Sequence, residues 1–144
     1  MRYVSSSTLA LWNDTAELVR LESFISGYCE QHGISPSIAM ELNLVAEECF
    51  VNVVEHGFDD QARHQIQVAL ELVTDVVTIT VEDEGVAFDP LSAPEFDPKT
   101  PIEQRRVGGL GIHLVRNLMD EVKYQRTDGK NRLTMRKSLL QAAD

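Results

Sequence analysis

The sequence has little of several features that define other classes of protein. Its uninterrupted apolar stretches are short, and its N-terminus has no apolar core before a cleavage site, so we expect neither a membrane span nor a secretion signal. The two cysteines, Cys29 and Cys49, lie far apart, which argues against a zinc knuckle or a redox pair. Both are expected to be free, buried thiols of a cytoplasmic protein.

Basic residues are also scarce relative to acidic ones. The 144 residues include 13 Lys and Arg against 23 Asp and Glu, for a formal net charge of −10. Because nucleic-acid binding draws on clustered Lys and Arg, this charge argues against direct nucleic-acid contact and favours a basic protein partner. The length and the 43% apolar content suit one domain, which we expect to span residues 1–144.

Apolar periodicity predicts three helices. Spacings of three and four residues predict a first helix from Asp14 to His32, ended by Gly33. Ser35-Pro36 supplies the cap and first-turn proline of a second helix that runs to about His56 and is ended by Gly57. The third helix is expected to begin at the glycines of residues 108–111.

Four β-rich segments predict two hairpins. The first pairs Gln65 to Val73 with Val76 to Val81, and the second pairs Glu121 to Thr127 with Arg132 to Lys137. Tyr3 to Leu11 is a candidate edge strand. The order of elements predicts an α/β fold, a two-layer sandwich with three helices on one face of a mixed, mostly antiparallel sheet.

The second helix carries a candidate catalytic face. Glu48, Asn52 and His56 stand four residues apart, which aligns their polar side chains along one side of the helix. Glu47 lies about 100° around the helix from Glu48, so only Glu48 shares the face of Asn52. An isolated pattern of this kind is usually a solvated helix edge, and its meaning depends on the motifs elsewhere.

Two further motifs suit a nucleotide. Asp83 ends a β-branched strand just before Gly85, where a carboxylate accepts a hydrogen bond from an exocyclic amine. Gly109-Leu110-Gly111 stands directly before a helix, where N–H groups and the helix dipole favour an anion. Between them, residues 84–107 carry four of the five prolines without periodicity, and residues from about 86 to 107 are a candidate lid.

In this order, the motifs resemble the N, G1 and G2 boxes of the GHKL ATPases. The segments ELNLVAEECFVNVVEHGF and VGGLGIHLVRNLMDEVKYQR are most similar to the anti-sigma-factor serine kinases, and the resemblance spans about Trp12 to Lys137. It implies the Bergerat ATP-binding fold and a protein-serine kinase that uses ATP and Mg²⁺. It also implies two partners, a small antagonist protein that is phosphorylated and a sigma factor or similar regulator that is sequestered.

The resemblance also implies a role for each site residue. Glu48 is expected to be the general base, Asn52 the Mg²⁺ ligand and Asp83 the acceptor for adenine. The remaining nucleotide contacts are expected from His56, Gly85, Arg106, Gly108, Gly109, Leu110 and Gly111.

Two positions depart from the family's pattern. Ala87 stands where many relatives have a second glycine. The glycine–threonine pair that often ends the site is replaced by Asp128 to Asn131, which leaves Asn131 or Thr134 to substitute for the threonine. The main alternative function is a nucleotide-gated binding switch without phosphotransfer. A histidine-kinase catalytic domain is a third hypothesis. The sequence does not determine whether the protein forms a homodimer.

The motifs predict Mg²⁺-dependent binding of ATP in preference to GTP, because the Asp83 carboxylate accepts hydrogen bonds and an amine donates them. Isothermal titration calorimetry with each nucleotide, with and without Mg²⁺, measures both properties. Equal affinity for ATP and GTP, or no Mg²⁺-dependent heat with ATP at millimolar concentration, would contradict the assignment of the site.

Overall fold

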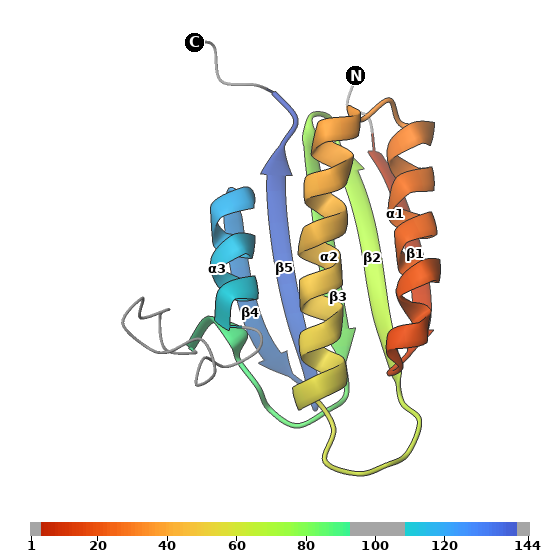
Figure 1. Cartoon of the computed structure of the whole chain (residues 1–144). Helices are drawn as coiled ribbons and strands as arrows, with labels where there is room; N and C mark the ends of the chain where they lie inside the picture. Colours follow the sequence, from red (N-terminus) through yellow and green to blue (C-terminus); the bar gives the residue numbers. More distant parts are fainter. Residues whose placement is uncertain (1–3, 93–108, 141–144) are drawn as a thin grey trace.

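The computed structural model describes residues 4–92 and 109–140, which form two layers (Figure 1). One sheet is built from five strands: β1 (Val4–Trp12), β2 (Gln65–Val73), β3 (Val76–Asp83), β4 (Glu121–Thr127) and β5 (Lys130–Ser138). Three helices cover one face of it: α1 (Leu18–Gln31), α2 (Pro36–His56) and α3 (Gly109–Leu118) (Figure 1). The predicted two-layer α/β sandwich is therefore confirmed.

The strand order across the sheet is β1-β2-β3-β5-β4, and all four neighbouring pairs of the described strands are antiparallel. The prediction that the sheet is mixed is thus wrong for these strands. The helix pair α1–α2 explains part of the difference, because one helix runs up and the next runs down (Figure 1). The chain returns to the end it left, so β2 runs opposite to β1.

Two-residue turns close both hairpins and fix their registers. Thr74 has a φ of 54°, and Asp128 and Gly129 have φ values of 54° and 75°, in the left-handed region that tight hairpin turns use. The return strand of the second hairpin begins at Lys130, earlier than predicted. This strand also pairs with β3, and in that register Asn131 stands directly opposite Asp83. The candidate edge strand is confirmed as β1, which pairs with β2 along its whole length.

The second predicted helix begins and ends as expected, whereas the first begins later. Ser35 caps α2, since its side chain accepts a hydrogen bond from the backbone N–H of Ile38. Asp14, the predicted start of the first helix, instead caps a short 3₁₀ turn, η1 (Thr15–Glu17). The α-helix proper starts only at Leu18.

The core lies between the helices and the sheet. Phe50, Leu42 and Val45 of α2 are fully buried against inward-facing strand residues such as Ile79 and Met135. Both cysteines are free and buried, as predicted. The sulfur of Cys49 lies 3.5 Å from that of Met135, so α2 is in direct contact with strand β5.

The described part of the proline-rich segment ends in a second 3₁₀ turn, η2 (Pro90–Ser92). Most of the predicted lid, with Arg106 and Gly108, lies outside the described residues. Within the residues described, none of the helices has the length and apolar character needed to cross a membrane.

Candidate functional site

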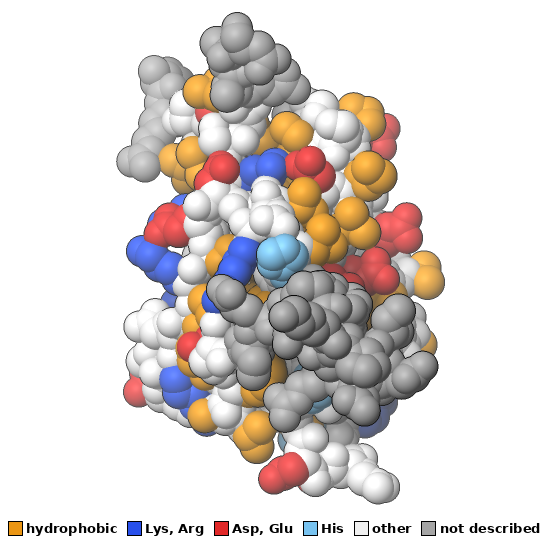
Figure 2. All heavy atoms as spheres, turned by 60° about the vertical axis from the view of Figure 1, so that its left-hand side comes forward, with side chains coloured by type: hydrophobic (Ala, Val, Ile, Leu, Met, Phe, Trp, Pro, Cys, Tyr) orange, Lys and Arg blue, Asp and Glu red, His pale blue; other side chains and the backbone are white. Residues whose placement is uncertain are grey.

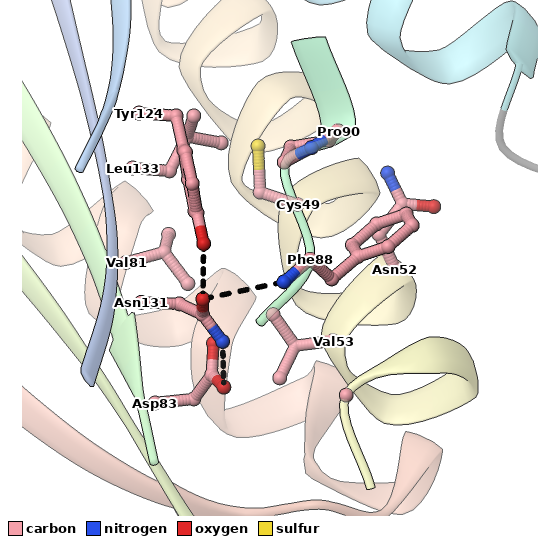
Figure 3. A pocket seen from close by; sticks show the side chains of 11 residues that line it. Cys49, Asn52, Val53, Val81, Asp83, Phe88, Pro90, Tyr124, Asn131 and Leu133 are labelled. Atoms are coloured by element: carbon pink, nitrogen blue, oxygen red, sulfur yellow. Dashed lines mark hydrogen bonds between the residues drawn. The ribbon is translucent and has the colours of Figure 1, made fainter. Parts of the chain in front are cut away.

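A narrow pocket that is partly open to solvent lies between α2 and the sheet (Figure 3). Most of its wall is apolar, from Cys49, Val53, Val81, Phe88, Pro90 and Leu133. Its polar side chains are Asn52, Asp83, Tyr124 and Asn131. Apolar walls with a few fixed polar groups are typical of sites for small organic ligands.

Asp83 supplies the polar end of the pocket, and two hydrogen bonds fix its carboxylate. The side-chain Nδ2 of Asn131 donates to Oδ1 of Asp83 at 3.0 Å, and the backbone N–H of Gly85 donates to the same oxygen at 2.8 Å. Oδ2 receives no hydrogen bond from another described residue. It is therefore the oxygen available to a donor group of a ligand.

Gly85 is the residue that lets the chain turn beside Asp83. A Cβ at this position would collide with the carbonyl oxygen of Gly57, at the end of α2. That same carbonyl accepts a hydrogen bond of 2.8 Å from the backbone N–H of Val86. The end of β3 is thus tied to the end of α2, and a glycine is required at the contact.

Helix α2 presents the predicted polar face, although only part of it reaches the pocket. Asn52 lines the pocket and is 7% exposed, and Glu48 is partly buried one turn earlier. His56 is exposed and does not line the pocket; its ring centroid lies 5.5 Å from that of Phe88, which does. The structure therefore brings Asn52 and Asp83 together and leaves His56 outside.

The glycine motif meets Glu48. A Cβ at Gly111 would collide with Oε2 of Glu48, so the glycine lets the first turn of α3 approach this carboxylate. Gly109 and Leu110 open α3, as the sequence predicted. The expected nucleotide contacts of Gly108 and Arg106 stay predictions, because both residues lie outside the described part of the chain.

Sequence reasoning missed Tyr124 and Phe88, and it left Asn131 and Thr134 as alternatives. Asn131 lines the pocket, whereas Thr134 lies on the opposite face of the sheet, beside Thr78 and Thr80. The period of two along a strand could have separated these alternatives, because residues three apart point to opposite faces. Nothing in the local sequence around Phe88 indicates that it reaches the pocket.

Asn52 suits a magnesium ion that also binds phosphates. No group of three or more His, Cys, Asp and Glu side chains is placed to hold a metal within the described ranges. Mg²⁺ does not need such a group, since it usually takes one or two protein ligands and keeps waters and phosphate oxygens. The nearly buried amide of Asn52 makes no hydrogen bond to another described residue, so its hard oxygen is available to the ion.

Burial raises the pKa of the Glu48 carboxyl above its ordinary value of 4.5, and the nearby charges of Glu47 and Glu55 raise it further. Glu48 is therefore a better proton acceptor than a solvated carboxylate. Burial, helped by the Glu48 charge, also raises the pKa of Cys49 to about 12. This thiol stays protonated at neutral pH and serves as an apolar wall.

The fold and the pocket agree with a known family. Residues 11–137 match the model of the histidine kinase-like ATPase domain. This match extends over most of the chain and includes Glu48, Asn52, Asp83 and Asn131. The chain therefore belongs to the family of histidine kinase-like ATPase domains.

Two relatives to which the chain is similar are protein kinases. The chain is 31% identical over 116 residues to the serine-protein kinase RsbW of Bacillus velezensis, covering 78% of this chain and 71% of the relative. It is 32% identical over 101 residues to the serine/threonine-protein kinase BtrW of Bordetella bronchiseptica, covering 70% and 71%. These relatives confirm the predicted resemblance to ATP-binding proteins of the serine-kinase type.

Solved structures support the fold. The RsbU and RsbW domains of a Mycobacterium tuberculosis protein superpose with a TM-score of 0.67 at 18% identity, over 93% of this chain and 32% of that one. The histidine kinase domain of a blue-light activated kinase from Erythrobacter litoralis gives a TM-score of 0.56 at 19% identity, over 87% and 60%. The second shows that the same fold also occurs in a different kinase class.

The raised pKa of Glu48 predicts that the ionised carboxylate destabilises the folded protein at neutral pH. The folded protein binds this proton more tightly than the unfolded chain, so the associated stabilisation is present below pH 4.5 and is lost as the pH rises through the folded pKa. Glu48→Gln should therefore raise the Tm at pH 7.5 and lose this advantage near pH 4. Thermal unfolding followed by circular dichroism measures both.

The exposed Glu22 of α1 provides the matched control, since Glu22→Gln changes the same atoms away from the pocket. It should shift the Tm little, and equally at the two pH values. A Glu48→Gln variant that is less stable than the wild type at pH 7.5 would show that the carboxylate is stabilised in the fold, contrary to this account.

Proposed function

We propose that this protein is a serine kinase that transfers the γ-phosphate of Mg·ATP to a small antagonist protein and that it also sequesters a sigma factor or similar regulator. The observation that carries the proposal is the placement of Glu48 one helical turn from Asn52, beside a pocket that ends in the Asp83 carboxylate. The kinase relatives support the same reaction class.

The pocket suits ATP in one orientation. Adenine enters between the apolar walls, with its exocyclic amine donating to Oδ2 of Asp83. The phosphates then lie toward Asn52 and the first turn of α3, whose N–H groups favour an anion. Asn52 would hold Mg²⁺ through its amide oxygen, and the ion would supply positive charge that offsets the charge of the transferring group.

Glu48 supplies what a nucleotide-binding site alone does not need. Its carboxylate lies against Gly111 at the start of α3, and its pKa is raised by burial. A carboxylate in this position accepts the proton of an incoming serine hydroxyl as the oxygen attacks the γ-phosphate. A switch that only binds nucleotide would use Asn52 and Asp83 without this base.

The surface of the helices suits a protein partner. The groove between α1 and α2 is lined by the exposed apolar side chains of Val19, Met40 and Leu44 together with the acids Glu22 and Glu47. Figure 2 shows apolar and acidic side chains interspersed on the right of the view. With a net charge of −10, this surface favours a partner that offers basic and apolar groups.

Two variants should fail in different ways if the proposal holds. Glu48→Gln removes the base and keeps the shape, so ATP affinity should change little while phosphate transfer falls by roughly 10² to 10⁴. Asn52→Ala should instead weaken Mg·ATP binding. Calorimetry measures affinity, and transfer of labelled phosphate to serine on proteins captured from the source cells measures activity.

Glu71→Gln is the control for transfer, because this exposed glutamate of β2 lies away from both the pocket and the groove and should keep the full activity. Transfer at the wild-type rate by Glu48→Gln would remove the base from the mechanism. If the wild type binds ATP but transfers phosphate to no captured partner, the nucleotide-gated binding switch replaces the kinase.

A further inference from the structure

Asn131 makes an unusually complete set of hydrogen bonds for a side chain in a ligand pocket. Its Nδ2 donates to Oδ1 of Asp83 at 3.0 Å and to the backbone carbonyl of Val86 at 2.8 Å. Its Oδ1 accepts from the backbone N–H of Phe88 at 3.4 Å and from the hydroxyl of Tyr124 (Figure 3). Both donors and both acceptor sites of the amide are therefore used.

These partners allow only one orientation of the amide. If the side-chain amide of Asn131 were flipped by 180° with its four partners unchanged, its oxygen would face the Asp83 carboxylate and the carbonyl of Val86. Its NH₂ group would then face the N–H donor of Phe88. Two repulsive contacts with acceptors make that orientation unfavourable, so the network holds a donor against Asp83.

The same amide shapes the loop that follows β3. Its oxygen accepts from the backbone N–H of Phe88, and its NH₂ group donates to the backbone carbonyl of Val86. The amide thus takes the place of the backbone groups with which a neighbouring strand would pair these two residues. Phe88 lines the pocket, so its position depends on Asn131 as well. One side chain thus connects the polar end of the pocket with part of its apolar wall.

We infer that Asn131 is a positioning residue for recognition of the purine 6-amino group. The Nδ2 group of Asn131 donates a hydrogen bond to Oδ1 of Asp83, which leaves Oδ2 as the oxygen that accepts a hydrogen bond from the ligand. A threonine hydroxyl has a single donor and could not serve both Asp83 and Val86. This inference rests on the proposed binding of ATP and is independent of phosphate transfer.

The test compares two nucleotides that differ only at the 6-position: ATP and purine riboside triphosphate, which carries hydrogen there. Wild-type protein should bind ATP more tightly by roughly 10- to 100-fold, the usual worth of a hydrogen bond to a charged group. In Asn131→Ala, this ratio should fall about three- to tenfold, because the carboxylate keeps only the hydrogen bond from the backbone N–H of Gly85 and is held less firmly. A role in folding alone would weaken both nucleotides equally and leave the ratio unchanged.

Tyr124→Phe provides a second variant that keeps the aromatic ring and removes one of the two donors to Oδ1 of Asn131. In this variant, the preference for ATP over purine riboside triphosphate should fall by less than in Asn131→Ala. Tyr124→Phe alone tests the positioning role of Asn131 if Asn131→Ala does not fold. Thr134→Ala, on the same strand and the opposite face of the sheet, should keep the wild-type ratio.

The outcomes separate the inference from the proposed function. An unchanged ratio in both Asn131→Ala and Tyr124→Phe, with ATP still preferred, would overturn the role of Asn131 and leave ATP binding intact. If wild-type protein does not distinguish the two nucleotides, Asp83 does not read the 6-amino group and the inference fails with it. If it binds neither, the proposed ATP-dependent function fails as well.

Discussion

The rotation of helix α2 about its own axis is the constraint on which the site depends. Leu42, Val45 and Phe50 are fully buried against the sheet, and burying three large apolar side chains allows the helix one orientation. With 3.6 residues per turn, that orientation also fixes the direction of Glu48 and Asn52. The core and the site are thus two sides of one element, and a change in the packing of the first would displace the second.

The sequence was informative where structure depends on local pattern. Period and capping residues predicted α2 with both of its ends, because Ser35 and Gly57 act on their immediate neighbours. The register that places Asn131 opposite Asp83 joins residues 48 positions apart, and local pattern does not determine such a pairing. The role of Asn131 therefore became visible only with the fold, as did the wall formed by Phe88.

The end of the pocket where the phosphates would lie differs electrostatically from the end that would hold adenine. The described lining contains no Lys or Arg, and Arg126 donates to the carbonyl oxygen of Gly85 at 2.7 Å. Within the described residues, the phosphates of a nucleotide would therefore depend on Mg²⁺ at Asn52 and on the start of α3. The Glu48 carboxylate adds a further negative charge near the phosphates. Its burial raises its pKa, and the raised pKa makes it a better base.

A crystal structure of the protein with Mg²⁺ and a slowly hydrolysed ATP analogue would show directly how the pocket binds a nucleotide. We expect the adenine amine within hydrogen-bond distance of Oδ2 of Asp83, with Oδ1 still held by Asn131. We also expect the metal on the amide oxygen of Asn52. A nucleotide bound elsewhere, or bound in this pocket with its phosphates toward Asp83, would contradict this mode of binding.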